Sequence, residues 1–109
     1  MTIKPANGEW VVRAGGAVLG ESHDALVLTE GDHPPVVYFP RKDIAMAMLE
    51  PSDHTSICPH KGRATYLSIQ TKSTIIENAV WSYEAPFDGV KKIAGYLAFS
   101  GENVAVEQL

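Results

Sequence analysis

The segment Thr-Ile-Ile-Glu-Asn-Ala-Val-Trp-Ser-Tyr (residues 74–83) gives the clearest structural signal in the chain. β-Branched and aromatic residues dominate it, and such residues favour strands. Successive side chains of a strand point to opposite faces. One face then carries Ile75, Glu77, Ala79, Trp81 and Tyr83, and the other carries Ile76, Asn78, Val80 and Ser82. The pattern predicts a strand over residues 74–83.

Similar short apolar runs recur on both sides of this segment and predict further strands. They cover residues 9–14, 17–20, 25–29, 36–39, 55–58, 64–71, 95–100 and 104–107. Glycines at 15–16 and the Pro-rich residues 30–35 mark turns between them. Only residues 41–49 show helical spacing, with Ile44 and Met48 four apart, and we expect one short helix there. This pattern predicts a mainly β protein built as a sandwich, a barrel or a strongly bent sheet.

Length and composition limit the classes of function. With 109 residues, of which 45% are hydrophobic, residues 1–109 are expected to form a single globular domain. A net charge of −4 argues against nucleic-acid binding. No apolar run is long enough to cross a membrane, and no secretory signal is recognisable at the N-terminus. One cysteine fits a reducing compartment, so we expect a cytoplasmic protein.

The segment Ser-Ile-Cys-Pro-His-Lys-Gly-Arg-Ala-Thr-Tyr (residues 56–66) is the first candidate site. Lys61 and Arg63 flank Gly62, a combination that suits contact with an anion as well as an ordinary surface turn. Cys58 is a nucleophile if a nearby cation or base, such as His60, activates it, and a packed thiol otherwise. His54, Ser56, Cys58 and His60 alternate along the chain, but the paired spacing of a zinc site is missing, so we predict no metal.

Aromatic residues form the second candidate site. Trp81 and Tyr83, two apart on the predicted strand, suit the wall of a pocket, with Tyr38 or Tyr66 as further members. Plain core packing is the alternative. Glu77 belongs to the same predicted face and is a candidate acid or base if that face is concave.

Five ordered motifs resemble the bacterial family called domain of unknown function 427, sometimes labelled nucleotidyltransferase-like. They lie at residues 36–44, 49–53, 58–64, 79–86 and 93–99, so the resemblance covers about residues 9–100. It implies a β-tent-like fold, in which two antiparallel sheets form a bent sandwich with a cleft. Relatives of that architecture hold zinc through four cysteines, and a chain with one cysteine is expected to lack it. The resemblance directs attention to Cys58, Pro59, Lys61, Gly62, Trp81, Tyr83 and Tyr96.

Three hypotheses for function follow. The first is binding of a small polar or anionic ligand in a cleft between the turn at 58–62 and the strand at 81–83, with Lys61 and Arg63 supplying charge. The second is an enzyme that uses Cys58 with His60 or Glu77 in that cleft. The third is a protein-interaction module or homodimer that pairs through a sheet edge such as residues 104–107. No cofactor is predicted.

Overall fold

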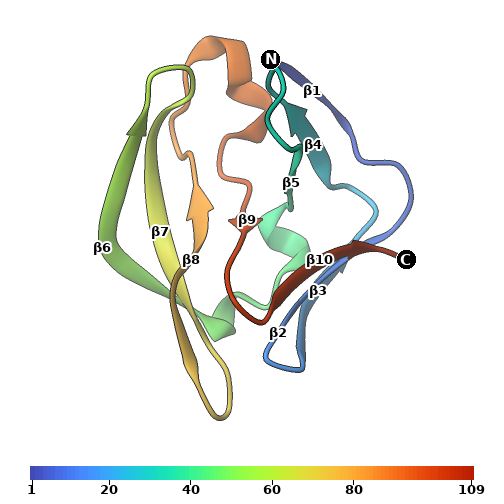
Figure 1. Ribbon diagram of the computed structural model, residues 1–109, viewed down its shortest axis with the longest axis vertical. Helices are drawn as coiled ribbons and strands as arrows, with labels where there is room; N and C mark the ends of the chain where they lie inside the picture. The colour runs from blue at the N-terminus through green and yellow to red at the C-terminus, as the bar shows by residue number, and fades with distance from the viewer.

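The computed structural model describes residues 1–109, and it confirms a mainly β protein (Figure 1). The regular elements are ten strands and three short 3-10 segments. They are β1 (Thr2–Pro5), β2 (Trp10–Ala14), β3 (Ala17–Ser22), β4 (Leu26–Thr29), β5 (Val36–Tyr38), η1 (Arg41–Asp43), η2 (Met46–Met48), β6 (Leu49–Cys58), β7 (Gly62–Gln70), β8 (Ile75–Ser82), η3 (Asp88–Ile93), β9 (Ala98–Phe99) and β10 (Val104–Gln108). None of the helical segments is long or apolar enough to cross a bilayer.

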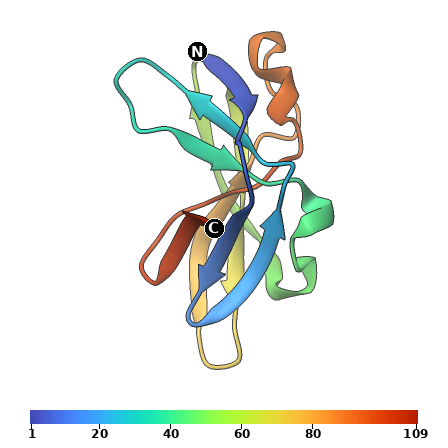
Figure 2. The same cartoon turned by 90° about the vertical axis from the view of Figure 1, so that its right-hand side faces the viewer.

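The strands form three antiparallel sheets, in the orders β1-β4-β5, β10-β2-β3 and β6-β7-β8-β9. Figure 1 shows β6, β7 and β8 on the left of the molecule and the sheets β1-β4-β5 and β10-β2-β3 towards the right, and in Figure 2 the four-stranded sheet lies behind the other two. The expected number of sheets was two. The difference arises within the N-terminal half, where one long hairpin is bent into two parts.

The bend lies at residues 6–9 and 23–25. β1 pairs with β4 and β2 pairs with β3, so both sheets come from the same two arms of chain. Between Pro5 and Trp10 the chain has four residues, whereas between their partners Leu26 and Ser22 it has three. Such an inserted residue bends a ladder. A single hydrogen bond, from Ala6 N to Ala25 O at 2.9 Å, continues across the bend.

The single helix predicted at residues 41–49 was wrong. Two 3-10 turns occupy the segment, and Ile44 between them is extended and forms a β-bridge with Gly20. Ala45 N donates to Leu19 O at 2.8 Å, so the backbone pairs with β3 at the point where a helix needs its own hydrogen bonds. A Cβ at Gly20 would collide with the Asp43 carbonyl oxygen, and glycine therefore permits this close approach.

The strands predicted at residues 95–100 and 104–107, which we expect to pair as a terminal hairpin from their closeness in the sequence, do not pair with each other. β9 pairs with β8 in the four-stranded sheet, whereas β10 pairs with β2 in another sheet. The connection is held at both ends, because Ser100 N donates to Ala79 O and Gly15 N donates to Asn103 O. The chain therefore crosses between sheets at residues 100–103 instead of turning back on itself.

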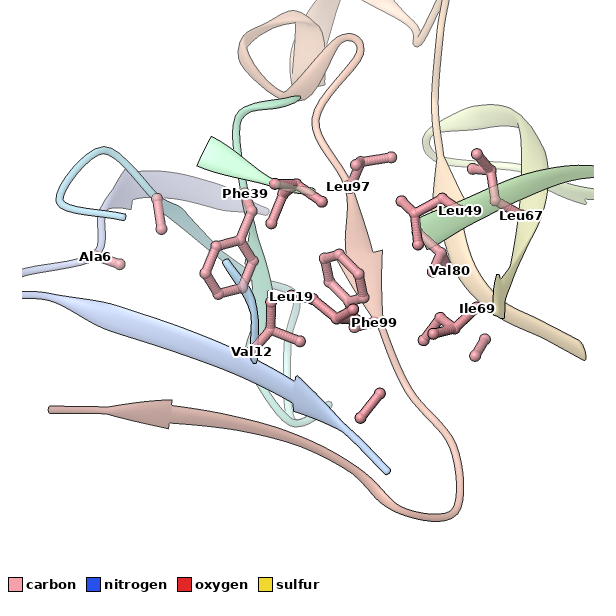
Figure 3. Packing of buried hydrophobic residues seen from close by; sticks show 14 residues of the cluster. Ala6, Val12, Leu19, Phe39, Leu49, Leu67, Ile69, Val80, Leu97 and Phe99 are labelled. Atoms are coloured by element: carbon pink, nitrogen blue, oxygen red, sulfur yellow. The ribbon is translucent and has the colours of Figure 1, made fainter. Parts of the chain in front are cut away.

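A cluster of 14 buried hydrophobic residues joins the three sheets (Figure 3). At its centre Phe39 and Phe99 meet edge to face with ring centroids 5.7 Å apart, an arrangement that aromatic pairs prefer. A second cluster of seven residues, which includes Tyr38 and Tyr83, lies beside β6–β9. Cys58, Tyr66 and Trp81 pack against that second cluster, so the candidate site is built on its surface.

Candidate functional site

The turn that joins β6 to β7 places the cysteine and the lysine together. Cys58 ends β6, Gly62 begins β7, and Lys61 N donates to Cys58 O at 3.3 Å. The loop after β8 closes over this turn, since Phe87 N donates to Lys61 O at 2.9 Å. Gly62 is buried with φ +114°, a conformation that favours glycine. It shapes the turn, and a ligand-contacting role for Gly62 stays a prediction.

Lys61 is the central charge of the site. Its side chain is only 12% exposed, and its Nζ lies 3.0 Å from Glu30 Oε1 and 3.4 Å from Cys58 Sγ. The same ammonium lies 6.0 Å from the centroid of the Tyr83 ring. Glu30 was not predicted as a site residue. It follows β4 in a loop 31 residues from Lys61, and no local sequence pattern links the two.

These contacts shift the pKa values of all three groups. Partial burial raises the pKa of Cys58, but backbone N–H groups of His60 and Lys61 and the Lys61 ammonium together lower it below its ordinary value. Burial opposes the charge on Lys61, and hydrogen bonds to Glu30 and Cys58 outweigh it, so the Lys61 pKa is raised. The hydrogen bond from Lys61 lowers the pKa of Glu30. The arrangement favours an anionic thiol at Cys58.

Next to this charged group lies a hollow of about 390 Å³ with a mainly aromatic lining. Its lining residues are Val36, Tyr38, Lys61, Tyr66, Asn78, Trp81, Tyr83 and Ser100. A second, more apolar hollow of about 490 Å³ shares Val36, Trp81 and Ser100 with it and reaches Trp10 and Val106. We call the two together the aromatic cleft; it lies where the three sheets meet.

Strand pairing explains why the aromatic side chains converge. Tyr66 and Trp81 are directly opposite each other on β7 and β8, and Tyr83 follows two residues after Trp81. Tyr38 comes from β5, in another sheet, and completes the wall. Trp81, Tyr83, Tyr38 and Tyr66 all line this hollow, and a ligand-binding role for Trp81 and Tyr83 stays a prediction.

The tyrosine hydroxyls differ in their partners. Tyr66 Oη lies 2.9 Å from Ser56 Oγ, whereas the Tyr83 hydroxyl has no hydrogen-bond partner in the protein. Because no fully enclosed polar side-chain atom lacks a partner, the Tyr83 hydroxyl opens into the hollow although the residue is only 7% exposed. Burial raises the pKa of Tyr83 to about 12 and also raises that of Tyr38. Both phenols are therefore neutral donors at physiological pH.

Other predicted residues lie elsewhere. His60 and Arg63 are exposed, and neither lines the aromatic cleft. Tyr96 packs against the second hydrophobic cluster without lining the cleft. Glu77 lines a separate polar hollow with Glu50 and His54. The structure therefore brings Lys61, Trp81 and Tyr83 together in one hollow, with Cys58 next to Lys61, and leaves His60, Arg63, Tyr96 and Glu77 apart.

Glu77 is displaced by a bulge in β8. Leu67 pairs with Val80 and Ile69 pairs with Ile76, so three residues of β8 oppose one residue of β7. Within this bulge Asn78 has φ +54°, which breaks the alternation of faces. The simple period-2 pattern that placed Glu77 on the face of Trp81 therefore fails at Asn78.

One sheet edge named as an interaction surface is indeed at the edge of its sheet. β10 pairs only with β2, and its residues are half-buried or exposed. The homodimer stays a prediction.

Fold and site together define a small β domain with an aromatic cleft beside a partly buried cysteine–lysine–glutamate contact. The chain belongs to the family described as Domain of unknown function (DUF427), whose model matches residues 2–108. This confirms the resemblance drawn from the five motifs and extends it to nearly the whole chain. No curated protein matches the sequence.

Proposed function

We propose that this protein binds a small neutral molecule that combines a flat apolar ring with a hydrogen-bond acceptor. One observation carries the proposal: three tyrosines, Trp81 and Lys61 converge from three sections of the chain on a single hollow. Its size supports the proposal, because ligand pockets typically measure roughly 300–1,000 Å³, and the two halves of the cleft measure about 390 and 490 Å³.

The lining suits a ring that is held between aromatic faces. Trp81 belongs to both halves of the cleft, so a ring placed against its indole contacts the tyrosines on one side and Val36 along the edge. Offset stacking and edge-to-face contacts contribute about 0.5–1.5 kcal/mol beyond the burial of area. Aliphatic residues such as Val27 and Val106 extend the apolar surface.

The polar groups suit an acceptor on the ligand. Tyr83 offers an unpartnered hydroxyl that stays protonated, and a donor of this kind satisfies a carbonyl or ring nitrogen. Leaving such a hydroxyl unpaired when the cleft fills with an apolar ligand costs about 1–3 kcal/mol. The cleft therefore discriminates in favour of ligands that bear an acceptor.

The sequence suggested a polar or anionic ligand, but the pairing of the charged residues at the cleft favours a neutral one. Lys61 is already paired with Glu30 at 3.0 Å and with Cys58 at 3.4 Å, and Arg63 does not line the cleft. A further anion therefore meets no uncompensated positive charge. Separating Lys61 from its partners to bind an anion leaves Glu30 without its cation, which opposes anion binding.

The test compares a matched pair of small ligands, benzamide and benzoate, by chemical-shift perturbation and by thermal shift. We expect benzamide to perturb residues of the cleft and benzoate to bind more weakly. Tyr83→Phe should weaken benzamide binding, whereas Tyr96→Phe, a phenol outside the cleft, should not. Stronger binding of benzoate than of benzamide would contradict the preference for a neutral ligand. Chemical-shift perturbations far from Trp81 would show that the ligand binds outside the aromatic cleft. Saturation at 100 times the dissociation constant stabilises the fold by about 2.7 kcal/mol.

A further inference from the structure

Two independent features of the site point to covalent chemistry. The first is the environment of Cys58, which is partly exposed and has Lys61 Nζ 3.4 Å from its sulfur. The turn also brings two backbone N–H groups toward the thiol and helps to lower its pKa. A thiolate with a cation and oriented N–H groups beside it is an activated nucleophile.

The second feature is the hydroxyl of Tyr83, which has no hydrogen-bond partner in the protein although the residue is only 7% exposed. This donor lines the same hollow as Lys61, and the Lys61 ammonium lies 6.0 Å from the Tyr83 ring. Cys58 packs against the buried cluster that contains Tyr83. Tyr83 and Lys61 therefore line one hollow, and the nucleophile lies next to this lining, with its sulfur 3.4 Å from Lys61 Nζ.

We propose that Cys58 is a covalent capture site for neutral conjugated carbonyl compounds held in the aromatic cleft. The inference rests on the proposed function in one respect, since the cleft must admit the compound. It replaces His60 and Glu77, the partners expected from the sequence, with Lys61. The lysine acts on the reaction through the charge of its ammonium beside the sulfur.

The reaction is a conjugate addition and needs no oxidant and no leaving group. The Cys58 sulfur forms a bond to the β-carbon, and the carbon–carbon π-bond breaks. Its electron pair moves toward the carbonyl oxygen, where the Tyr83 hydroxyl stabilises the developing negative charge. A proton from solvent then reaches the α-carbon and replaces the one that the thiol lost. The product is a thioether that contains all the atoms of thiol and reagent.

The lining of the cleft favours this class of electrophile over charged or strongly hydrated ones. An apolar wall of Val36 and Trp81 suits the carbon skeleton, and a neutral phenol suits the carbonyl oxygen. Since the Lys61 charge is balanced by Glu30, the site gains little from an electrophile that carries its own anion. A cyclic enone meets all these conditions.

The experiment incubates the protein with 2-cyclohexenone at pH 7 and follows intact mass. We expect one addition, absent in Cys58→Ser, at a rate above that of glutathione. Lys61→Met should slow the addition, roughly three- to fourfold for each unit by which the thiol pKa rises, because the loss of thiolate is partly offset by the greater nucleophilicity of a more basic thiolate. Lys42→Met, which removes only an exposed ion pair, should not slow it. A rate no faster than that of glutathione would overturn the proposal.

Tyr83→Phe separates recognition in the cleft from simple thiol reactivity. It should slow the addition of cyclohexenone several-fold but leave unchanged the rate with methyl methanethiosulfonate, which has no carbonyl. An equal rate of cyclohexenone addition in Tyr83→Phe would overturn the role of the cleft. Binding of benzamide to Cys58→Ser tests the proposed function separately. If benzamide binds but no adduct forms in the wild type, only the covalent proposal fails, and if neither occurs, both fail.

Discussion

Tyr66 and Trp81 lie directly opposite each other on β7 and β8 and project from the same side of the sheet. Opposite residues of an antiparallel pair have neighbouring side chains, so this pairing builds one wall of the aromatic cleft. The pairing depends on the bulge at Asn78, because the register of the two strands differs before and after it. A slip of one residue would turn Trp81 to the other face of the sheet.

Replacement of Asn78 tests this dependence. Asn78 has φ +54°, which asparagine tolerates, glycine adopts freely and a β-branched residue strongly disfavours. We expect Asn78→Val to reduce the free energy of unfolding by about 1–3 kcal/mol and to alter the near-ultraviolet circular dichroism of the tryptophans. Asn78→Gly removes the same side chain but permits the same backbone conformation. A larger loss of unfolding free energy in Asn78→Gly than in Asn78→Val would therefore contradict the explanation.

Glu30→Gln should change how the free energy of unfolding depends on pH in the acidic range. Its hydrogen bond with Lys61 lowers the pKa of Glu30 below 4.5 in the folded protein. The stabilisation is therefore fully present above the unfolded pKa and is lost as the pH falls through the folded value. Urea denaturation between about pH 5 and pH 3 should show a flatter decline in Glu30→Gln than in the wild type. Glu107→Gln, at an exposed strand edge, is the control, and parallel curves for all three proteins would refute the prediction.

The same substitution should make Cys58 more acidic. Removing the Glu30 carboxylate leaves the Lys61 ammonium with the thiol as its only charged partner, and a nearby uncompensated cation favours the thiolate. We expect the pH profile of alkylation by iodoacetamide to shift to lower pH in Glu30→Gln and to higher pH in Lys61→Met. A shift in the same direction for both variants would show that Glu30 acts by positioning Lys61 instead of by its charge.

Gly20→Ala tests the contact that replaces the expected helix. The added Cβ would collide with the Asp43 carbonyl oxygen and lie 2.7 Å from Ile44 Cδ1, so the segment must move away from β3. Such overpacking typically costs about 1–3 kcal/mol. Gly89→Ala is a matched control, because open space surrounds Gly89. Thermal denaturation should show a clear loss for Gly20→Ala alone, and equal midpoints would mean that the segment adapts without cost.

The sequence predicted what depends on local pattern and missed what depends on distant pairing. Trp81 and Tyr83 were predicted as neighbours because strand periodicity places them on one face, and Lys61 was predicted beside Cys58 because the two share a short turn. Glu30 was missed, since a contact across 31 residues leaves no local pattern. Glu77 was assigned to the wrong face because a bulge cannot be read from alternation alone. The spacing of Ile44 and Met48 wrongly predicted a helix for a related reason, because the segment pairs with β3, which is distant in the sequence.

Tyr83→Phe should remove part of the alkaline instability of the protein. Burial raises the pKa of Tyr83 from its ordinary value of 10.0 to about 12 in the folded state. Between these values the folded protein retains a proton that the unfolded chain has lost, so stability falls as the pH rises through this range. Phenylalanine keeps the ring and has no proton to lose, and the free energy of unfolding should therefore decline less steeply from about pH 10 to pH 12. Tyr96→Phe removes a phenol outside the cleft and serves as the control in the same denaturation series. If Tyr83→Phe and Tyr96→Phe flatten the decline equally, the Tyr83 hydroxyl is better solvated than the structure indicates, and its role as a neutral donor in the cleft loses its physical basis.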